Sequence, residues 1–507
     1  MSFRTSTPAN FTTVPTINYL PDEILGRIFY LVSCASTLCQ ASRRDLLSVT
    51  YVCRRWRHLA LALGELWMHL SILFPITEQE LLRAKEWVSR SNPYPLTIII
   101  DIRDPDWDFN EESHLVTRFE MQATMGVILP VAERWRSVNI LADNWEPLHV
   151  FLHHTQNILV PILRNLHLVR CNPYFAAPSQ VFVPSNLRAP YSLLGGVSSD
   201  ELTSIELEGV HVDWASPALH NLTKLSLGYH ARDVIPTLGQ FRDLLHSSPK
   251  LESFSLIGWG PQLDEASVSS IELQESRGSI RLPQLTSLEV GVMIPSYTVE
   301  VLSLFMIPRL ESLTIDDITR YDPQTSTRPD LGPIFNFLAG QTSSFHPLSI
   351  ATEHLTSLAI MNLDPGEIPF SAFLHSLQCL RVLHIRNCTT SVFSGLAPDS
   401  AGSTACHSLR QLCVDGCDPN ALADVISSRK LGTVSYDMAV NLLLDTEDPT
   451  SALSTETATR LQELNISVTP LVPSMNRQWK SYEFDDSEAL VSAILEERWD
   501  VAGTVIQ

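Results

Sequence analysis

The chain has 507 residues, of which 44% are hydrophobic and 18% are charged, and its formal net charge is −21. This composition excludes an intrinsically disordered protein, and the length exceeds what one hydrophobic core usually serves, so we expect several domains or one elongated array. The acidic field disfavours nucleic acid and anionic membranes as partners, and it favours neutral or basic ones.

The N-terminal stretch and the cysteines predict where the protein resides. Residues 1–16, "MSFRTSTPANFTTVPT", are rich in Ser, Thr and Pro, predict a disordered leader, and lack the apolar core of a signal peptide. No apolar run reaches the roughly 18 residues of a membrane span. The nine cysteines do not form close pairs, as is typical of free thiols in a reducing compartment. We therefore expect a protein of the cytoplasm and/or nucleus, without a membrane partner.

The first regular pattern is "INYLPDEILGRIFYLV", which predicts a short amphipathic helix. Pro21 suits the first turn of a helix, where its missing N–H costs nothing, and Asp22 complements the positive end of the helix dipole. A second helical pattern runs through residues 45–62, "DLLSVTYVCRRWRHLALA". Because some fifty residues cannot bury all this apolar surface against themselves, we expect an exposed patch that binds a partner.

The ordered set "LPDEIL..IF", "LL.V..VCRRWR.LA" and "LW" resembles the F-box domain over residues 17–70. The link from Val32 to Asp45 is longer than in many members, and it is similar to a variety frequent in mushroom-forming fungi. The resemblance implies a three-helix unit that binds the Skp adaptor of a cullin–RING ubiquitin ligase. The adaptor-binding residues that it implies are Leu20, Pro21, Ile24, Leu25, Ile28, Phe29, Leu47, Val52, Cys53 and Trp56. Of these, Leu20, Pro21, Ile24, Leu25 and Phe29 are predicted to be less buried than their hydrophobicity warrants.

Between this unit and the repeats, the sequence predicts no flexible linker. A capping box from Thr77 to Glu80 predicts the start of a helix, and residues 95–101 and 135–141 predict strands. An array that begins directly after residue 70 would move with the N-terminal unit as one rigid piece.

Ten segments of the following chain share the pattern L-x-x-L-x-L, with Leu at position one and apolar residues at positions four and six. In a strand, positions four and six point to the same side, and position one completes the turn onto that side. The pattern is the leucine-rich-repeat signature, which predicts parallel strands stacked into a curved solenoid. The first leucines are Leu163, Leu202, Leu222, Leu251, Leu285, Leu310, Leu355, Leu380, Leu409 and Leu461.

Helical stripes at 238–250, 300–308 and 370–379 predict the return segments of this solenoid, and 319–330 predicts an exposed insertion. The predicted fold class is therefore α/β: an all-α N-terminal F-box at 17–70, a leucine-rich-repeat solenoid with a parallel sheet at 71–469, and a C-terminal cap or tail at 470–507. Within that tail, residues 485–499 predict an amphipathic helix that covers the last repeat.

Positions three, five and seven of the repeats are predicted to line the concave face, where solenoids usually bind their ligands. Small residues, mainly serines, alternate there with charged ones, so this face predicts a trough for a basic protein segment. The alternative is a solvated sheet face without a ligand. The candidate target-binding residues are Glu206, Glu208, Glu289, Asp316, His384, Arg386 and Asp415.

No pattern predicts a metal, a cofactor or catalysis. Cys406, His407, Cys413 and Cys417 lack the C-x-x-C spacing of a zinc knuckle. The chain contains no Gly-rich phosphate loop, no G-x-S-x-G elbow and no H-E-x-x-H helix.

We therefore expect a non-enzymatic adaptor, the substrate receptor of an SCF-type ubiquitin ligase, whose solenoid binds a protein target. The alternative is a leucine-rich-repeat scaffold or inhibitor that binds a basic protein independently of any ligase.

Overall fold

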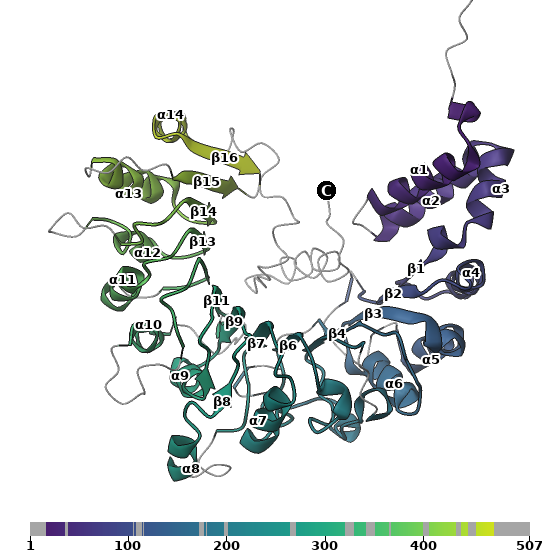
Figure 1. Cartoon of the computed structure of the whole chain (residues 1–507), viewed down its shortest axis with the longest axis horizontal. Helices are drawn as coiled ribbons and strands as arrows, with labels where there is room; N and C mark the ends of the chain where they lie inside the picture. The colour runs from purple at the N-terminus through teal and green to yellow at the C-terminus, as the bar shows by residue number, and fades with distance from the viewer. Residues whose placement is uncertain are drawn as a thin grey trace, which may run out of the picture.

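The structure, a computed structural model, describes residues 17–35, 39–104, 106–107, 114, 116–171, 177–178, 180–196, 201–263, 270–319, 329–340, 350–364, 367–398, 405–431, 438–444 and 453–470. Within these ranges, a helical head leads into a long parallel sheet that curves into an arc (Figure 1). This agrees with the predicted α/β class. The predicted leader, most of the predicted insertion and the predicted tail helix lie outside the described residues.

The head consists of three α-helices framed by two 3-10 turns. They are η1 (Ile17–Tyr19), α1 (Asp22–Ala35), α2 (Cys39–Val52), α3 (Arg54–Ala62) and η2 (Gly64–Trp67). The second helical pattern, over residues 45–62, is divided at Cys53 into the end of α2 and the whole of α3. Cys53 has extended backbone angles (φ −159°, ψ 173°), and its Sγ accepts a hydrogen bond from the Trp56 N–H at 3.5 Å, so it caps α3 and ends the continuity with α2.

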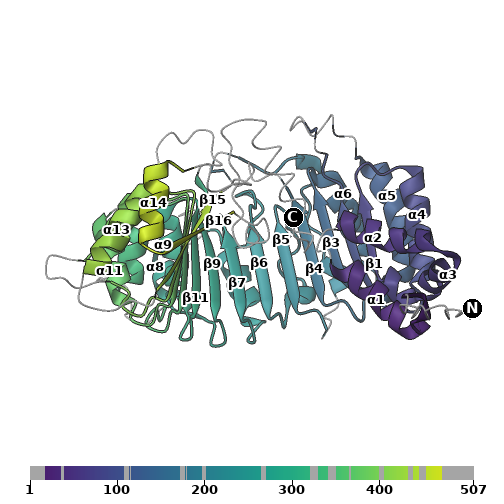
Figure 2. The same ribbon diagram turned by 90° about the horizontal axis from the view of Figure 1, so that it is seen from above.

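The fourteen described strands of the main sheet are all parallel, and they follow one another in chain order across the sheet (Figure 2). The short strands β8 (Ile280–Arg281) and β10 (Phe305–Met306) form a separate parallel pair. The strands of the main sheet are β1 (His69–Leu73), β2 (Leu96–Asp101), β3 (Trp135–Ala142), β4 (Asn165–Arg170), β5 (Ser204–Glu208), β6 (Lys224–Gly228), β7 (Ser253–Ile257), β9 (Ser287–Val292), β11 (Ser312–Asp317), β12 (Ser357–Met361), β13 (Val382–Arg386), β14 (Gln411–Asp415), β15 (Ala439–Leu444) and β16 (Ile466–Pro470).

Helices return the chain from one strand to the next along the outer, convex side of the arc, and the strands line its inner side (Figure 1). This arrangement follows from the parallel order, because a parallel pair needs a crossover connection. The helices are α4 (Glu78–Arg90), α5 (Arg118–Ile128), α6 (Trp145–Thr155), α7 (Leu238–His246), α8 (Ser270–Glu275), α9 (Pro295–Ser303), α10 (Gly332–Leu338), α11 (Glu367–Ser376), α12 (Ser391–Ser394), α13 (Pro419–Leu431) and α14 (Thr455–Glu463).

Stacked apolar side chains fill the space between the sheet and the helices. Position four of successive repeats stays in register, so that Leu288, Leu313 and Leu358 lie side by side on β9, β11 and β12. Each of the three is at most 1% exposed. One contiguous core extends from Leu25 in the head to Ile466 in the last strand, so each repeat buries its apolar face mainly against its neighbours.

A left-handed residue ends many of the strands, at position eight of the repeat. Gly209, Gly258 and Gly416 have positive φ angles there, and so do Asn362 and Asn387. Glycine and asparagine tolerate this conformation at low cost, which explains why small residues recur at this position. The turn directs the chain from the inner face of the arc toward its outer side.

The structure differs from the repeats predicted from the sequence at three places. The last repeat was placed at Leu461, but Leu461 belongs to α14, and β16 begins at Ile466. The long gap before it contains a strand that the pattern missed, β15, because "MAVNLLL" lacks the first leucine. At the other end, β1 precedes the two strands that were predicted before Leu163.

The head joins the arc through buried contacts. Arg43 of α2 forms an ion pair with Glu80 of α4 at 3.1 Å, and Glu80 also accepts from Arg83 and from the Leu73 N–H of β1. The rings of Trp67 and Trp87 meet edge to face at 4.5 Å. These contacts are consistent with the expected rigid connection.

Candidate functional site

The head exposes apolar side chains at the end where α1 begins and α2 meets α3. Ile24 is 49% exposed and Val52 is 59% exposed, although both are hydrophobic. Arg55, in the first turn of α3, ties the start of α3 to the start of α1, since its guanidinium donates to the Leu20 carbonyl and pairs with Asp22 at 2.6 Å. We call this surface the apolar end of the head; it comprises Tyr19, Pro21, Ile24, Tyr51 and Val52.

The ten predicted adaptor-binding residues divide by burial. Pro21, Ile24, Val52 and Cys53 are exposed, and Leu20, Ile28, Leu47 and Trp56 are half-buried. The expectation of reduced burial is wrong for Leu25 and Phe29, which are 0% and 1% exposed. They point into the three-helix core, where the Phe29 ring lies 4.9 Å from that of Trp56, so they hold the head together and present no surface.

Among the described residues of the head, six large apolar side chains are exposed but were not predicted: Ile17, Tyr19, Leu31, Val32, Tyr51 and Leu61. Tyr19 and Tyr51 are 76% and 75% exposed, and Leu31 is 53% exposed. Leu31 follows Ile24 by seven residues, so the helical period places both on one face of α1, and this spacing was a usable signal. Tyr51 carried no such signal, because its exposure depends on where α2 ends.

The inner face of the arc contains a hollow of about 300 Å³, here called the concave groove, over strands β5 to β13. Five of the seven predicted target-binding residues line it: Glu206, Glu208, Glu289, Asp316 and His384. Parallel register places Ser226 and Ser255 between Glu206 and Glu289, so the floor is shallow where the side chains are small.

The acidic and basic side chains that line the groove are four carboxylates, one lysine and one histidine. Lys224 is the basic residue among its lining side chains. Burial lowers the pKa of His384, which keeps its imidazole neutral at neutral pH. The groove is therefore acidic. Asp316 is held in place by Asn362, whose Nδ2 donates to Oδ1 at 2.6 Å.

The other two predicted residues, Arg386 and Asp415, do not line the groove. The Arg386 Nε lies 3.0 Å from the Asp415 carboxylate, and each side chain is 12% exposed. The opposite charges of the two side chains neutralise each other between β13 and β14. Neither side chain lines the concave groove.

The part of the chain that the structure describes contains neither a candidate metal site nor a candidate membrane-spanning helix. There, no group of three His, Cys, Asp or Glu side chains is arranged to hold a metal ion. Cys406 and Cys413 are buried, and burial raises the pKa of the Cys406 thiol to about 12. None of the described helices is both long and apolar enough to cross a bilayer.

In the comparison with protein families, a match falls on the head. The F-box-like family matches residues 17–73. The head is an F-box-like domain. No curated protein matches the chain.

The F-box-like domain ends at Leu73, the last residue of β1, and this strand belongs to the sheet of the arc. The domain and the arc therefore share a strand, and the exposed apolar end lies on η1, Pro21 and the helices α1 and α2 of the domain.

Proposed function

We propose that this protein is the substrate-recognition subunit of an SCF-type cullin–RING ubiquitin ligase. In this proposal, the F-box-like domain binds a Skp-type adaptor, and the arc, a leucine-rich-repeat solenoid, binds a protein target. The protein performs no chemistry itself and acts in the cytoplasm and/or nucleus. The observation that carries the proposal is the exposed apolar end on a domain that matches the F-box-like family.

The apolar end supports docking on energetic grounds. A fully buried Ile or Val side chain contributes about 1.5–3 kcal/mol relative to an exposed one, so leaving several in water is unfavourable without a partner. The core of the domain is complete without them, since Leu25, Phe29 and Leu46 already fill it. Tyr19, Ile24 and Val52 are thus available to a partner without unfolding the domain.

The shared strand of the domain and the arc supports an adaptor that holds its target at a fixed distance and orientation from the domain. A target held on the arc keeps a fixed position relative to the ligase core, which raises its effective concentration near the ubiquitin-charged enzyme. The concave groove supports a basic target segment, because its carboxylates outnumber Lys224.

The direct test is adaptor binding by the full chain with Ile24→Asp and Val52→Asp. Each change places a charge on the apolar end, so we expect Skp-type adaptor binding to weaken by at least about tenfold per substitution. Leu25 is unsuitable, because a buried aspartate there would unfold the domain. Leu82→Asp is the matched control, since Leu82 is 57% exposed on α4, outside the domain.

Unchanged adaptor binding in the double variant would contradict the proposal. The chain would then be better described as a leucine-rich-repeat scaffold or inhibitor of a basic protein, an alternative that the acidic groove favours.

A further inference from the structure

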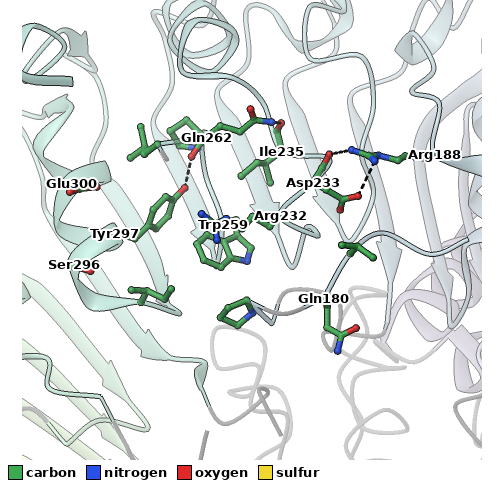
Figure 3. A pocket seen from close by; sticks show the side chains of 15 residues that line it. Gln180, Arg188, Arg232, Asp233, Ile235, Trp259, Gln262, Ser296, Tyr297 and Glu300 are labelled. Atoms are coloured by element: carbon green, nitrogen blue, oxygen red, sulfur yellow. Dashed lines mark hydrogen bonds and ion pairs between the residues drawn. The ribbon is translucent and has the colours of Figure 1, made fainter. Parts of the chain in front are cut away.

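A second hollow, the rim pocket, lies where the chain leaves strands β6, β7 and β9 (Figure 3). Its volume is about 630 Å³, within the range of about 300–1,000 Å³ for ligand pockets in proteins. Its walls come from three successive repeats and from the segment around Gln180 and Arg188. The rim pocket is distinct from the concave groove, which lies on the face of the sheet.

An aromatic pair forms one wall of the rim pocket. The Trp259 ring is 2% exposed, and the Tyr297 ring meets it at 5.0 Å, nearly edge to face. The Tyr297 hydroxyl donates to the Pro261 carbonyl at 2.7 Å and accepts from the Gly260 N–H at 2.8 Å. These bonds fix the wall before any ligand arrives, which lowers the cost of binding.

The charges around the rim pocket balance. Arg188 pairs with Asp233 at 3.2 Å, and the Arg232 guanidinium lies 5.2 Å from the centre of the Trp259 ring. Glu300 is the second carboxylate of the lining. Two cations and two anions give no net charge, so the group that enters need not carry one. Ile235, Trp259 and Ile294 favour an apolar group.

One apolar cluster contributes lining residues both to the rim pocket and to the concave groove. Tyr229 and Ile257 line the groove, Ile235 and Trp259 line the pocket, and all four belong to one small apolar cluster. Ile257 and Trp259 are two residues apart, which corresponds to at most about 7 Å of chain. An extended peptide crosses such a distance within about two to four residues.

We propose that the rim pocket binds a large apolar side chain, preferably aromatic, of the same extended target segment that places a Lys or Arg in the concave groove. This inference rests on the proposed function and names its target class: a segment with an aromatic and a basic residue two to four positions apart. The neutral pocket selects the first residue, and the acidic groove selects the second.

The test uses fluorescein-labelled ten-residue peptides of Gly and Ser that carry one Phe and one Lys, two, three or four positions apart, in both orders. Binding to the full chain is measured by fluorescence anisotropy. We expect at least one peptide to bind about tenfold more tightly than its matched forms with Phe→Ser or Lys→Gln.

Two variants assign the binding to the rim pocket. Ser296 is exposed on the pocket lining, so Ser296→Trp adds bulk there without removing a buried contact, and it is expected to weaken the best peptide about tenfold. Ser394→Trp, at an exposed site on α12, is the control and should leave binding unchanged.

Three results would overturn the inference. The peptides could fail to bind, they could bind with the same affinity when Phe is replaced by Ser, or their affinity could stay unchanged in the Ser296→Trp variant. Adaptor binding, measured on the same preparations, reports on the proposed function separately. An intact adaptor complex without peptide binding rejects only the rim pocket, whereas peptide binding without an adaptor complex rejects only the ligase role.

Discussion

At the scale of single residues, the turn at position eight of the repeat shows how local geometry constrains the sequence. Gly416 has a φ of +61°, and a Cβ there would overlap the Asn387 Oδ1 of the preceding repeat. The backbone conformation therefore favours glycine or asparagine, and the Asn387 side chain leaves no room for a Cβ unless it moves. By contrast, Gly126 lies exposed in α5, and a Cβ added there would project into open space.

This contrast gives a matched pair of substitutions. Gly416→Ala should lower the free energy of unfolding by at least about 1–2 kcal/mol, because alanine disfavours the left-handed region and its methyl group meets Asn387. Gly126→Ala should raise it by about 0.5–1 kcal/mol, since alanine is the better helix former. Thermal unfolding followed by circular dichroism measures both. Equal melting temperatures for the two variants would contradict this account of the turn.

At the scale of elements, the head depends on α4 and β1 for its attachment. Burial alone would raise the pKa of Glu80, but its hydrogen bond to Arg83 and the charges of Arg83 and Arg43 hold that pKa below the ordinary value of 4.5. A depressed carboxyl pKa contributes stability above the unfolded-state value, and this contribution is lost as the pH falls below about 4.5.

Glu80→Gln should therefore loosen the head. We expect a loss of about 1–2 kcal/mol at pH 7, because a charge-assisted network is reduced to neutral hydrogen bonds, and a smaller loss at pH 4. Hydrogen exchange of residues 39–73 reports directly on the contacts between the head and the arc. Glu86→Gln, in an exposed pair with Arg90 on the same helix, should change little. If the loss of unfolding free energy caused by Glu80→Gln were the same at pH 7 and pH 4, the ionic contacts of Glu80 would not account for the attachment of the head.

Element prediction from sequence succeeded where the period was strict. Within the main sheet, the strands from β4 to β14 follow the L-x-x-L-x-L segments, since position four and position six must face one core. It failed where the first leucine was absent, at β15, and where a helix contributed a leucine of its own, at Leu461. Local spacing cannot distinguish a leucine of a strand from one of the adjoining helix.

At the scale of the whole molecule, the composition bears on how the protein behaves within a ligase. The chain contains only five lysines, of which Lys224 lies in the concave groove, where a bound target would cover it. In the proposed ligase, few acceptor lysines would limit the ubiquitination of this subunit itself.

Charge-preserving substitutions test this directly. The residues Arg281, Arg309, Arg381 and Arg410 are exposed, and changing all four to lysine leaves the net charge unaltered. In a ligase reconstituted with the adaptor, cullin and RING subunits, we expect the four-lysine variant to be self-ubiquitinated several-fold faster than the unchanged chain. Rapid self-ubiquitination of the unchanged chain would refute the idea.

The sequence by itself determined the helical N-terminal unit, the strands of the main sheet from β4 to β14 and the face of each of these strands that is buried, because all three follow from residue spacing along one segment. Only the tertiary structure decided which apolar residues of the head remain outside, placing Leu25 and Phe29 in its core and Ile24 and Val52 on its surface. It alone also assembled the rim pocket, whose walls come from Arg188, Asp233, Trp259 and Tyr297 on separate repeats. The physical reason is that burial depends on what lies opposite a side chain, and here the opposing segments are distant in the chain.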